Sequence, residues 1–118
     1  MGSRIYTITV DCHEPRRLAE FWKGMLGYVD AYDDGDEVCI EPKGENESGP
    51  ALLFGQNPDA KMTKNRIHFD LAPDDQDAEV QRAVSLGASP VDIGQRDVSW
   101  VVLADPEGNE FCILSARD

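Results

Sequence analysis

The sequence predicts an α+β fold built from two copies of a β-α-β-β-β unit. Residues 5–11 alternate as a strand does, and a helical pattern follows that ends at Leu26-Gly27. Residues 66–71 repeat the strand pattern, and a second helical pattern ends at Leu86-Gly87. Strand-like segments follow each Leu-Gly pair. The pairs lie about 60 residues apart, which is not a solenoid period, so the chain repeats one supersecondary unit twice.

The first half begins with a strand at residues 5–12, whose alternation separates its two faces. Pro15 suits the first turn of a helix, where its missing N–H costs nothing, and Gly27 suits the end of that helix. Between them lies an apolar stripe at helical spacing, formed by Leu18, Phe21, Trp22 and Met25. Two strands joined across a DDGD turn, at 28–32 and 37–41, then a polar loop at 43–49 and a strand at 51–54, complete this half.

The second half follows a polar connector at residues 57–65 and begins with a strand at 67–71. Pro73-Asp74-Asp75 suits the positive N-terminus of a helix. The apolar stripe of this helix is formed by Val80, Ala83 and Val84, and the helix is expected to end at Gly87. A short strand at 90–93 and a hairpin at 98–114 close the chain. We expect Asp105 to cap the DPEGN turn of this hairpin through its side chain.

Length and charge limit the possible functions. The 118 residues predict a single domain over 1–118, with module one at about 4–56 and module two at about 65–116; such a chain buries about 65% of its unfolded surface. A net charge of -12 argues against nucleic acid and against anionic membranes. The three cysteines follow no disulfide or CxxC spacing, which favours a reducing, cytoplasmic location.

Several segments together resemble the vicinal-oxygen-chelate (VOC) superfamily, which holds glyoxalase I, bleomycin-resistance proteins and extradiol dioxygenases. They are DCHEP at 11–15, LAEFW at 18–22, LGY at 26–28, KNRIHFDL at 64–71, LGA at 86–88 and WVVLADPEGNEFC at 100–112. The chain is most similar to the small glyoxalase-like, bleomycin-resistance-like branch. The resemblance implies paired βαβββ modules that form a cup-shaped mixed sheet, usually in a homodimer.

The resemblance also implies where a metal would bind. Metal-dependent members carry ligands on the first and fourth strands of each module, and these positions match Thr7, His68, Cys112 and a residue near Leu53. A catalytic divalent site usually needs three protein ligands, and threonine and leucine supply essentially none. We therefore expect no cofactor and no standard metal centre. A divalent metal remains possible, with His68 and Cys112 as weak candidates that Asp70 could join.

The residues expected to face the ligand, inside the cup, are Thr7, Thr9, His68, Asp70, Trp100 and Cys112. His68 could bind ligand or transfer a proton, because histidine changes charge near neutral pH, or it could be a hydrogen-bonded strand residue. Cys112 is more readily explained as a buried structural cysteine than as a nucleophile. Trp100 could stack on a flat ligand or pack in the core, since its face is not fixed by the pattern.

Three functions follow from these observations. The favoured one is a protein that binds a small apolar or aromatic molecule in its cup without a standard metal centre. The alternative is a metal-dependent lyase or isomerase of glyoxalase type, or a dioxygenase-like enzyme, that polarises a vicinal oxygen pair. The third is a dimeric interaction domain with a vestigial cup. Whether the protein is an enzyme stays open, and no catalytic residue is assigned.

Overall fold

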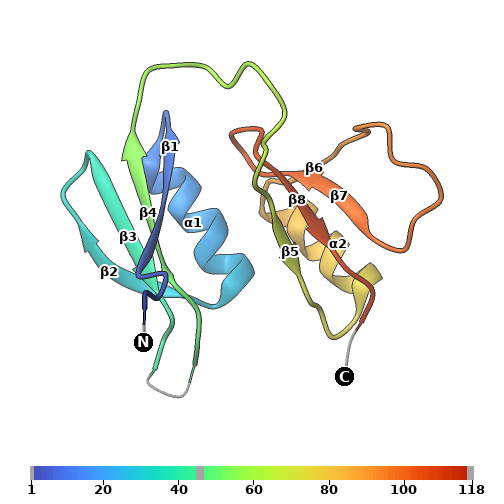
Figure 1. Ribbon diagram of the computed structural model, residues 1–118, viewed down its shortest axis with the longest axis horizontal. Helices are drawn as coiled ribbons and strands as arrows, with labels where there is room; N and C mark the ends of the chain where they lie inside the picture. Colours follow the sequence, from blue (N-terminus) through green and yellow to red (C-terminus); the bar gives the residue numbers. More distant parts are fainter. Residues whose placement is uncertain (1, 45–46, 117–118) are drawn as a thin grey trace. The chain divides into compact units, whose positions relative to one another are not determined.

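The computed structural model describes residues 2–44 and 47–116 and divides the chain into two compact units, one up to Ala60 and the other from Lys61 (Figure 1). Each unit contains one β-α-β-β-β module, as the sequence predicts. Strand pairing lies within each module and gives two four-stranded mixed sheets. No helix in the described part of the chain has the length and apolar character needed to cross a membrane.

Module one orders its sheet β1-β4-β3-β2. Its strands β1 and β4 run parallel, and the remaining neighbours run antiparallel. Its elements are β1 (Thr7–Cys12), α1 (Pro15–Leu26), β2 (Val29–Asp33), β3 (Glu37–Glu41) and β4 (Ala51–Gln56).

Helix α1 covers module one and packs mainly on β3 and β4. The whole predicted stripe of α1 is buried, and the rings of Phe21 and Trp22 meet edge to face with centroids 5.1 Å apart. The helix ends where predicted, because Gly27 takes the left-handed conformation with φ 69° and its N–H donates to the carbonyl of Lys23.

Module two repeats the topology with the order β5-β8-β7-β6, in which β5 and β8 are parallel. Its elements are β5 (Phe69–Leu71), α2 (Gln76–Leu86), β6 (Ser89–Pro90), β7 (Val101–Ala104) and β8 (Glu110–Ile113). Asp75 caps α2 by accepting a hydrogen bond from the Ala78 N–H.

Helix α2 covers its sheet less completely than α1 does. It packs against β8, and Ala83 is its one buried residue among those described, whereas Val84 of the predicted stripe stays exposed. The core of module two is instead supplied by the sheet, where Leu103, Phe111 and Ile113 are fully buried. These residues occupy one face of β7 and β8, which leaves the opposite face for other contacts.

Most predicted strands differ from the structure at one or both ends. The strand predicted at 28–32 is Val29–Asp33, the strand predicted at 51–54 extends to Gln56, and the hairpin predicted at 98–114 is Val101–Ala104 with Glu110–Ile113. The first strand begins at Thr7, and β5 begins at Phe69, so His68 precedes its strand instead of lying within it. The strand predicted at 90–93 is only Ser89–Pro90. It ends there because Asp92 accepts a hydrogen bond from the Gly94 N–H, and Gly94 has a φ of 92° that turns the chain.

The turn between β7 and β8 is held by Asp105, and this prediction is confirmed. The carboxylate is 4% exposed, and its Oδ1 accepts hydrogen bonds from the backbone N–H groups of Glu107 at 2.9 Å and Asn109 at 3.0 Å. The Asn109 side chain donates to both carboxylate oxygens. One acid therefore fixes the connection that aligns β7 with β8.

We expect Asp105→Ala to lower the free energy of unfolding by about 1–3 kcal/mol, because it leaves part-buried backbone donors without an acceptor. Asp92→Ala is the matched control, since Asp92 caps a similar turn in an exposed position and should cost less than about 0.5 kcal/mol. Urea unfolding measures both values. Equal losses for the two variants would contradict the role assigned to Asp105.

Candidate functional site

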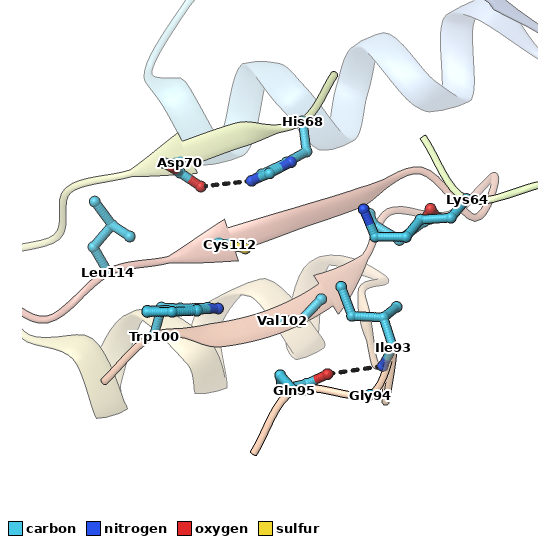
Figure 2. A pocket seen from close by; sticks show the side chains of 11 residues that line it. Lys64, His68, Asp70, Ile93, Gly94, Gln95, Trp100, Val102, Cys112 and Leu114 are labelled. Atoms are coloured by element: carbon cyan, nitrogen blue, oxygen red, sulfur yellow. Dashed lines mark hydrogen bonds and ion pairs between the residues drawn. The ribbon is translucent and has the colours of Figure 1, made fainter. Parts of the chain in front are cut away.

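A cavity of about 420 Å³ opens on module two (Figure 2). Ligand pockets in proteins usually measure about 300–1,000 Å³, so this cavity is large enough for a small molecule. The residues that line it are Lys64, His68, Asp70, Ile93, Gly94, Gln95, Trp100, Val102, Glu110, Cys112 and Leu114. All of them belong to the compact unit that begins at Lys61 and contains module two.

The lining follows from strand alternation. Side chains two residues apart share a face of a strand, and the cavity is lined by His68 with Asp70, Trp100 with Val102, and Glu110 with Cys112 and Leu114. The register places Cys112 beside Asp70 on one side and beside Val102 on the other. The cavity thus lies over the sheet face that does not carry Phe111 and Ile113.

A polar cluster forms one wall of the cavity. His68 Nε2 lies 3.2 Å from Asp70 Oδ1, and both side chains are partly exposed. One possible ligand atom from each of His68, Asp70 and Cys112 lies within 4.8 Å of the others. The structure therefore brings together the two metal candidates of the sequence and the aspartate that was expected to join them.

Cys112 is buried within this cluster, at 6% exposure. Burial raises the pKa of its thiol, and the negative charge of Asp70 and a hydrogen bond to Asp70 raise it further, against a smaller opposing effect of Lys64. Thiolates, not thiols, act as nucleophiles. A thiol that is held protonated at neutral pH is a poor nucleophile, which agrees with the structural role expected for Cys112.

An apolar wall faces this cluster. Trp100 precedes β7 and is 42% exposed, and Val102, Leu114 and Ile93 extend the apolar surface. Figure 2 shows Trp100 and Leu114 at one end of the site and Lys64 at the other. Trp100 is therefore on the cavity side of its strand, a question that the sequence leaves open.

Glu110 anchors the segment that leads into β5. Its carboxylate is only 7% exposed, accepts a hydrogen bond from the Asn65 N–H at 2.7 Å, and pairs with Lys61 Nζ at 2.8 Å. Burial by itself would raise the pKa of Glu110, but the interactions with Lys61 and Asn65 outweigh it and lower that pKa below its usual value. Lys64 lies between these two anchored residues.

The six expected site residues divide between the modules. His68, Asp70, Trp100 and Cys112 line the cavity, whereas Thr7 and Thr9 lie on β1 in module one. A ligand-binding role for all six stays a prediction. The sequence pattern does not indicate several other lining residues, among them Lys64, Gln95, Val102 and Glu110. Strand alternation counted two residues from Trp100 and Cys112 points to Val102 and Glu110.

The ligand set of the metal-dependent relatives does not fit module one. Its β1–β4 register pairs Thr7 with Ala51 and Thr9 with Leu53, so these positions offer hydroxyl groups but neither carboxylate nor imidazole. Zinc sites use such carboxylate, imidazole or thiolate donors. His68, Asp70 and Cys112 form a different donor group within module two, and this group could hold a metal ion.

A family model for the glyoxalase-like domain matches residues 7–114, which is nearly the whole chain. The chain belongs to the glyoxalase-like domain family, within the VOC superfamily. The motifs that suggested this resemblance, from 11–15 to 100–112, all lie within the matched range. No curated protein matches the sequence significantly.

Solved structures of the superfamily resemble this glyoxalase-like protein in fold. A glyoxalase/bleomycin resistance protein/dioxygenase family enzyme from Burkholderia phytofirmans PsJN has a TM-score of 0.72 at 15% identity, covering 94% of this chain and 97% of its own. The fosfomycin resistance protein FosX from Listeria monocytogenes, solved as a mutant with Mn(II) and a dihydroxypropylphosphonic acid, has a TM-score of 0.74 at 15% identity, with coverage of 99% and 93%.

A bleomycin-binding protein from Streptomyces verticillus, solved with copper(II)-bleomycin, has a TM-score of 0.62 at 13% identity and covers 99% of both chains. Identities this low establish a shared fold and no shared activity. The function of this glyoxalase-like protein must therefore be argued from its own site.

We expect Glu110→Gln to destabilise the protein by about 1–3 kcal/mol at pH 7, because the charged acceptor of Lys61 and Asn65 is lost. A carboxylate with a lowered pKa stabilises the folded state above its unfolded pKa of about 4.3, and that stabilisation is lost as the pH falls through the folded pKa. The difference in the free energy of unfolding between wild type and Glu110→Gln should therefore become smaller at acid pH.

Urea unfolding between pH 7 and pH 3 measures this dependence. Glu41→Gln, at the exposed end of β3, is the control and should change little at any pH. If the difference in the free energy of unfolding between Glu110→Gln and wild type stays constant down to pH 3, the charge of Glu110 contributes nothing to stability.

Proposed function

We propose that this glyoxalase-like protein binds a small molecule with an apolar or aromatic portion in the cavity of module two, without a standard metal centre. The observation that carries this proposal is the cavity itself, in which the exposed ring of Trp100 lies on the same surface as the His68–Asp70 pair. An apolar pocket with a few placed polar groups is the usual design of a small-molecule site.

The chemistry of the lining favours binding over catalysis. The raised pKa of Cys112 disfavours a thiolate nucleophile, and the positions at Thr7 and Leu53 supply no strong metal ligand. Trp100 offers a flat apolar surface, and His68 and Asp70 offer hydrogen-bonding groups that orient a ligand. The bleomycin-binding relative is consistent with a binding function on this fold.

A metal-dependent lyase or isomerase is the second candidate, and one observation favours it. His68, Asp70 and Cys112 provide three donors close together, as a catalytic site with one open position requires, and FosX was solved with Mn(II). A bound divalent metal would polarise a vicinal oxygen pair of the substrate. Occupancy would require the Cys112 thiol to give up its proton, which makes metal affinity pH-dependent.

The proposal includes a cytoplasmic homodimer that contacts neither nucleic acid nor membrane. The net charge of -12 supports the absence of nucleic-acid and membrane partners, because phosphate-rich surfaces repel an acidic protein. The dimer rests on the family resemblance. Thr7 and Thr9 stay candidates for ligand contact in module one.

Trp100→Ala should weaken binding of an aromatic ligand about five- to thirtyfold, because a stacked ring contributes on the order of 1–2 kcal/mol. A thermal-shift screen of aromatic and antibiotic-like compounds would supply the ligand, and calorimetric titration would measure its dissociation constant. Tyr32→Ala removes an aromatic side chain of similar exposure in module one and should leave affinity unchanged. If ligands bind Trp100→Ala as tightly as wild type, this cavity is not their binding site.

Metal analysis separates the two candidate functions. We expect protein purified without a histidine tag to hold substoichiometric metal, before and after chelation, and in the same amount in His68→Ala. His13→Ala is the control, since His13 contacts the Asp59 carbonyl in module one. Near-stoichiometric metal that is lost in His68→Ala and kept in His13→Ala would overturn the binding proposal and favour the lyase or isomerase.

A further inference from the structure

The charged groups around the cavity of module two are unequally partnered. The carboxylate of Glu110 pairs with Lys61 at 2.8 Å and accepts the Asn65 N–H. The carboxylate of Asp70 pairs with His68 at 3.2 Å. Each negative group of the lining therefore already has a positive or hydrogen-bonding partner from the protein.

Lys64 is the exception among these charges. Its ammonium group donates to the backbone carbonyl of Asn65 at 3.2 Å, and no carboxylate among residues 2–44 and 47–116 forms an ion pair with it. A carbonyl of the adjacent residue satisfies one of its three N–H donors and neutralises none of its charge. The cavity thus contains one cation without a counter-charge.

The segment that carries Lys64 is anchored next to it. The backbone N–H of Asn65 donates to the buried carboxylate of Glu110 on β8, and the side chain of Lys61 pairs with the same carboxylate. Figure 2 shows the Lys64 side chain extending over the strands at the end of the site away from Trp100. The positive charge of Lys64 also acts on the Cys112 thiol, where it opposes the larger effects of burial and Asp70 that raise the pKa.

We infer that the ligand is a planar aromatic oxyanion, with its ring system on Trp100 and its anionic group at Lys64. This inference deepens the proposed binding function and depends on it. Glu110 and Leu114, near the two ends of the site, are four residues apart and therefore about 13 Å apart along the strand. That length suits a fused or linked pair of rings with an acid group at one end.

The net negative charge of the whole protein opposes an anionic ligand, whereas Lys64 attracts one. Which effect is larger depends on the distances from these charges to the ligand. At physiological ionic strength charges more than about 8 Å apart are largely screened, and the -12 net charge is spread over the entire chain. Lys64 acts at contact distance. Because Lys64 is exposed, its preference for an anion is modest, about fivefold in dissociation constant, which corresponds to about 1 kcal/mol.

The test uses probes of one shape that differ in charge. Naphthoate and naphthyl phosphate carry an oxyanion, naphthamide is neutral, and naphthylmethylammonium is cationic. Calorimetric titration of wild type, Lys64→Met and Trp100→Ala gives the dissociation constants. Lys43→Met, which removes an exposed lysine of module one, is the control for a general change of protein charge.

We expect wild type to bind at least one oxyanion about fivefold more tightly than naphthamide, and Lys64→Met to abolish that preference while Lys43→Met keeps it. Naphthoate and naphthyl phosphate together show whether a carboxylate or a phosphate is preferred. Naphthamide binding that depends on Trp100, with no preference for the anions or with one for the cation, would overturn the inference and leave the proposed function intact. Probes that all fail to bind, or that bind independently of Trp100, would overturn both.

Discussion

The two-sided character of β8 is the constraint on which the rest of module two depends. Phe111 and Ile113 are fully buried, and a one-residue slip of register would expose both of them and bury Leu114 in their place. Because the core holds them, Glu110, Cys112 and Leu114 must face the cavity. The buried carboxylate of Asp105 fixes the turn that sets this register, so the turn positions the cavity-lining residues although Asp105 is not one of them.

The two modules share a topology but use their helices differently. Helix α1 buries a continuous stripe that includes Phe21 and Trp22, whereas α2 buries Ala83 among its described residues. Module two therefore depends more on its own strands and on the Glu110 anchor for a stable core. Glu110 also lines the cavity, so one carboxylate contributes both to local stability and to the proposed binding site.

The elements that the sequence predicts well are those with a local physical cause. Pro15, Gly27 and Asp105 act within a few residues of themselves, so their roles could be read from the chain and agree with the structure. The prediction of a strand at 90–93 is wrong in its extent, because a turn at Asp92–Gly94 replaces strand pairing there. Lys64 and Gln95 could not be found, because loop residues follow no period and reach the cavity only through long-range contacts.

The cluster of His68, Asp70 and Cys112 is compatible with both of the functions considered, ligand binding and metal binding. In the described structure they satisfy one another: Asp70 pairs with His68, and the thiol of Cys112 bonds to Asp70. A metal would replace these contacts with stronger ones, but only after the thiol lost a proton that burial and Asp70 both retain. A higher pH makes it easier for the thiol to lose this proton, and a lower pH makes it harder. If this cluster binds a metal, the proton on Cys112 would therefore compete with it, and a lower pH would favour the hydrogen-bonded form of the cluster.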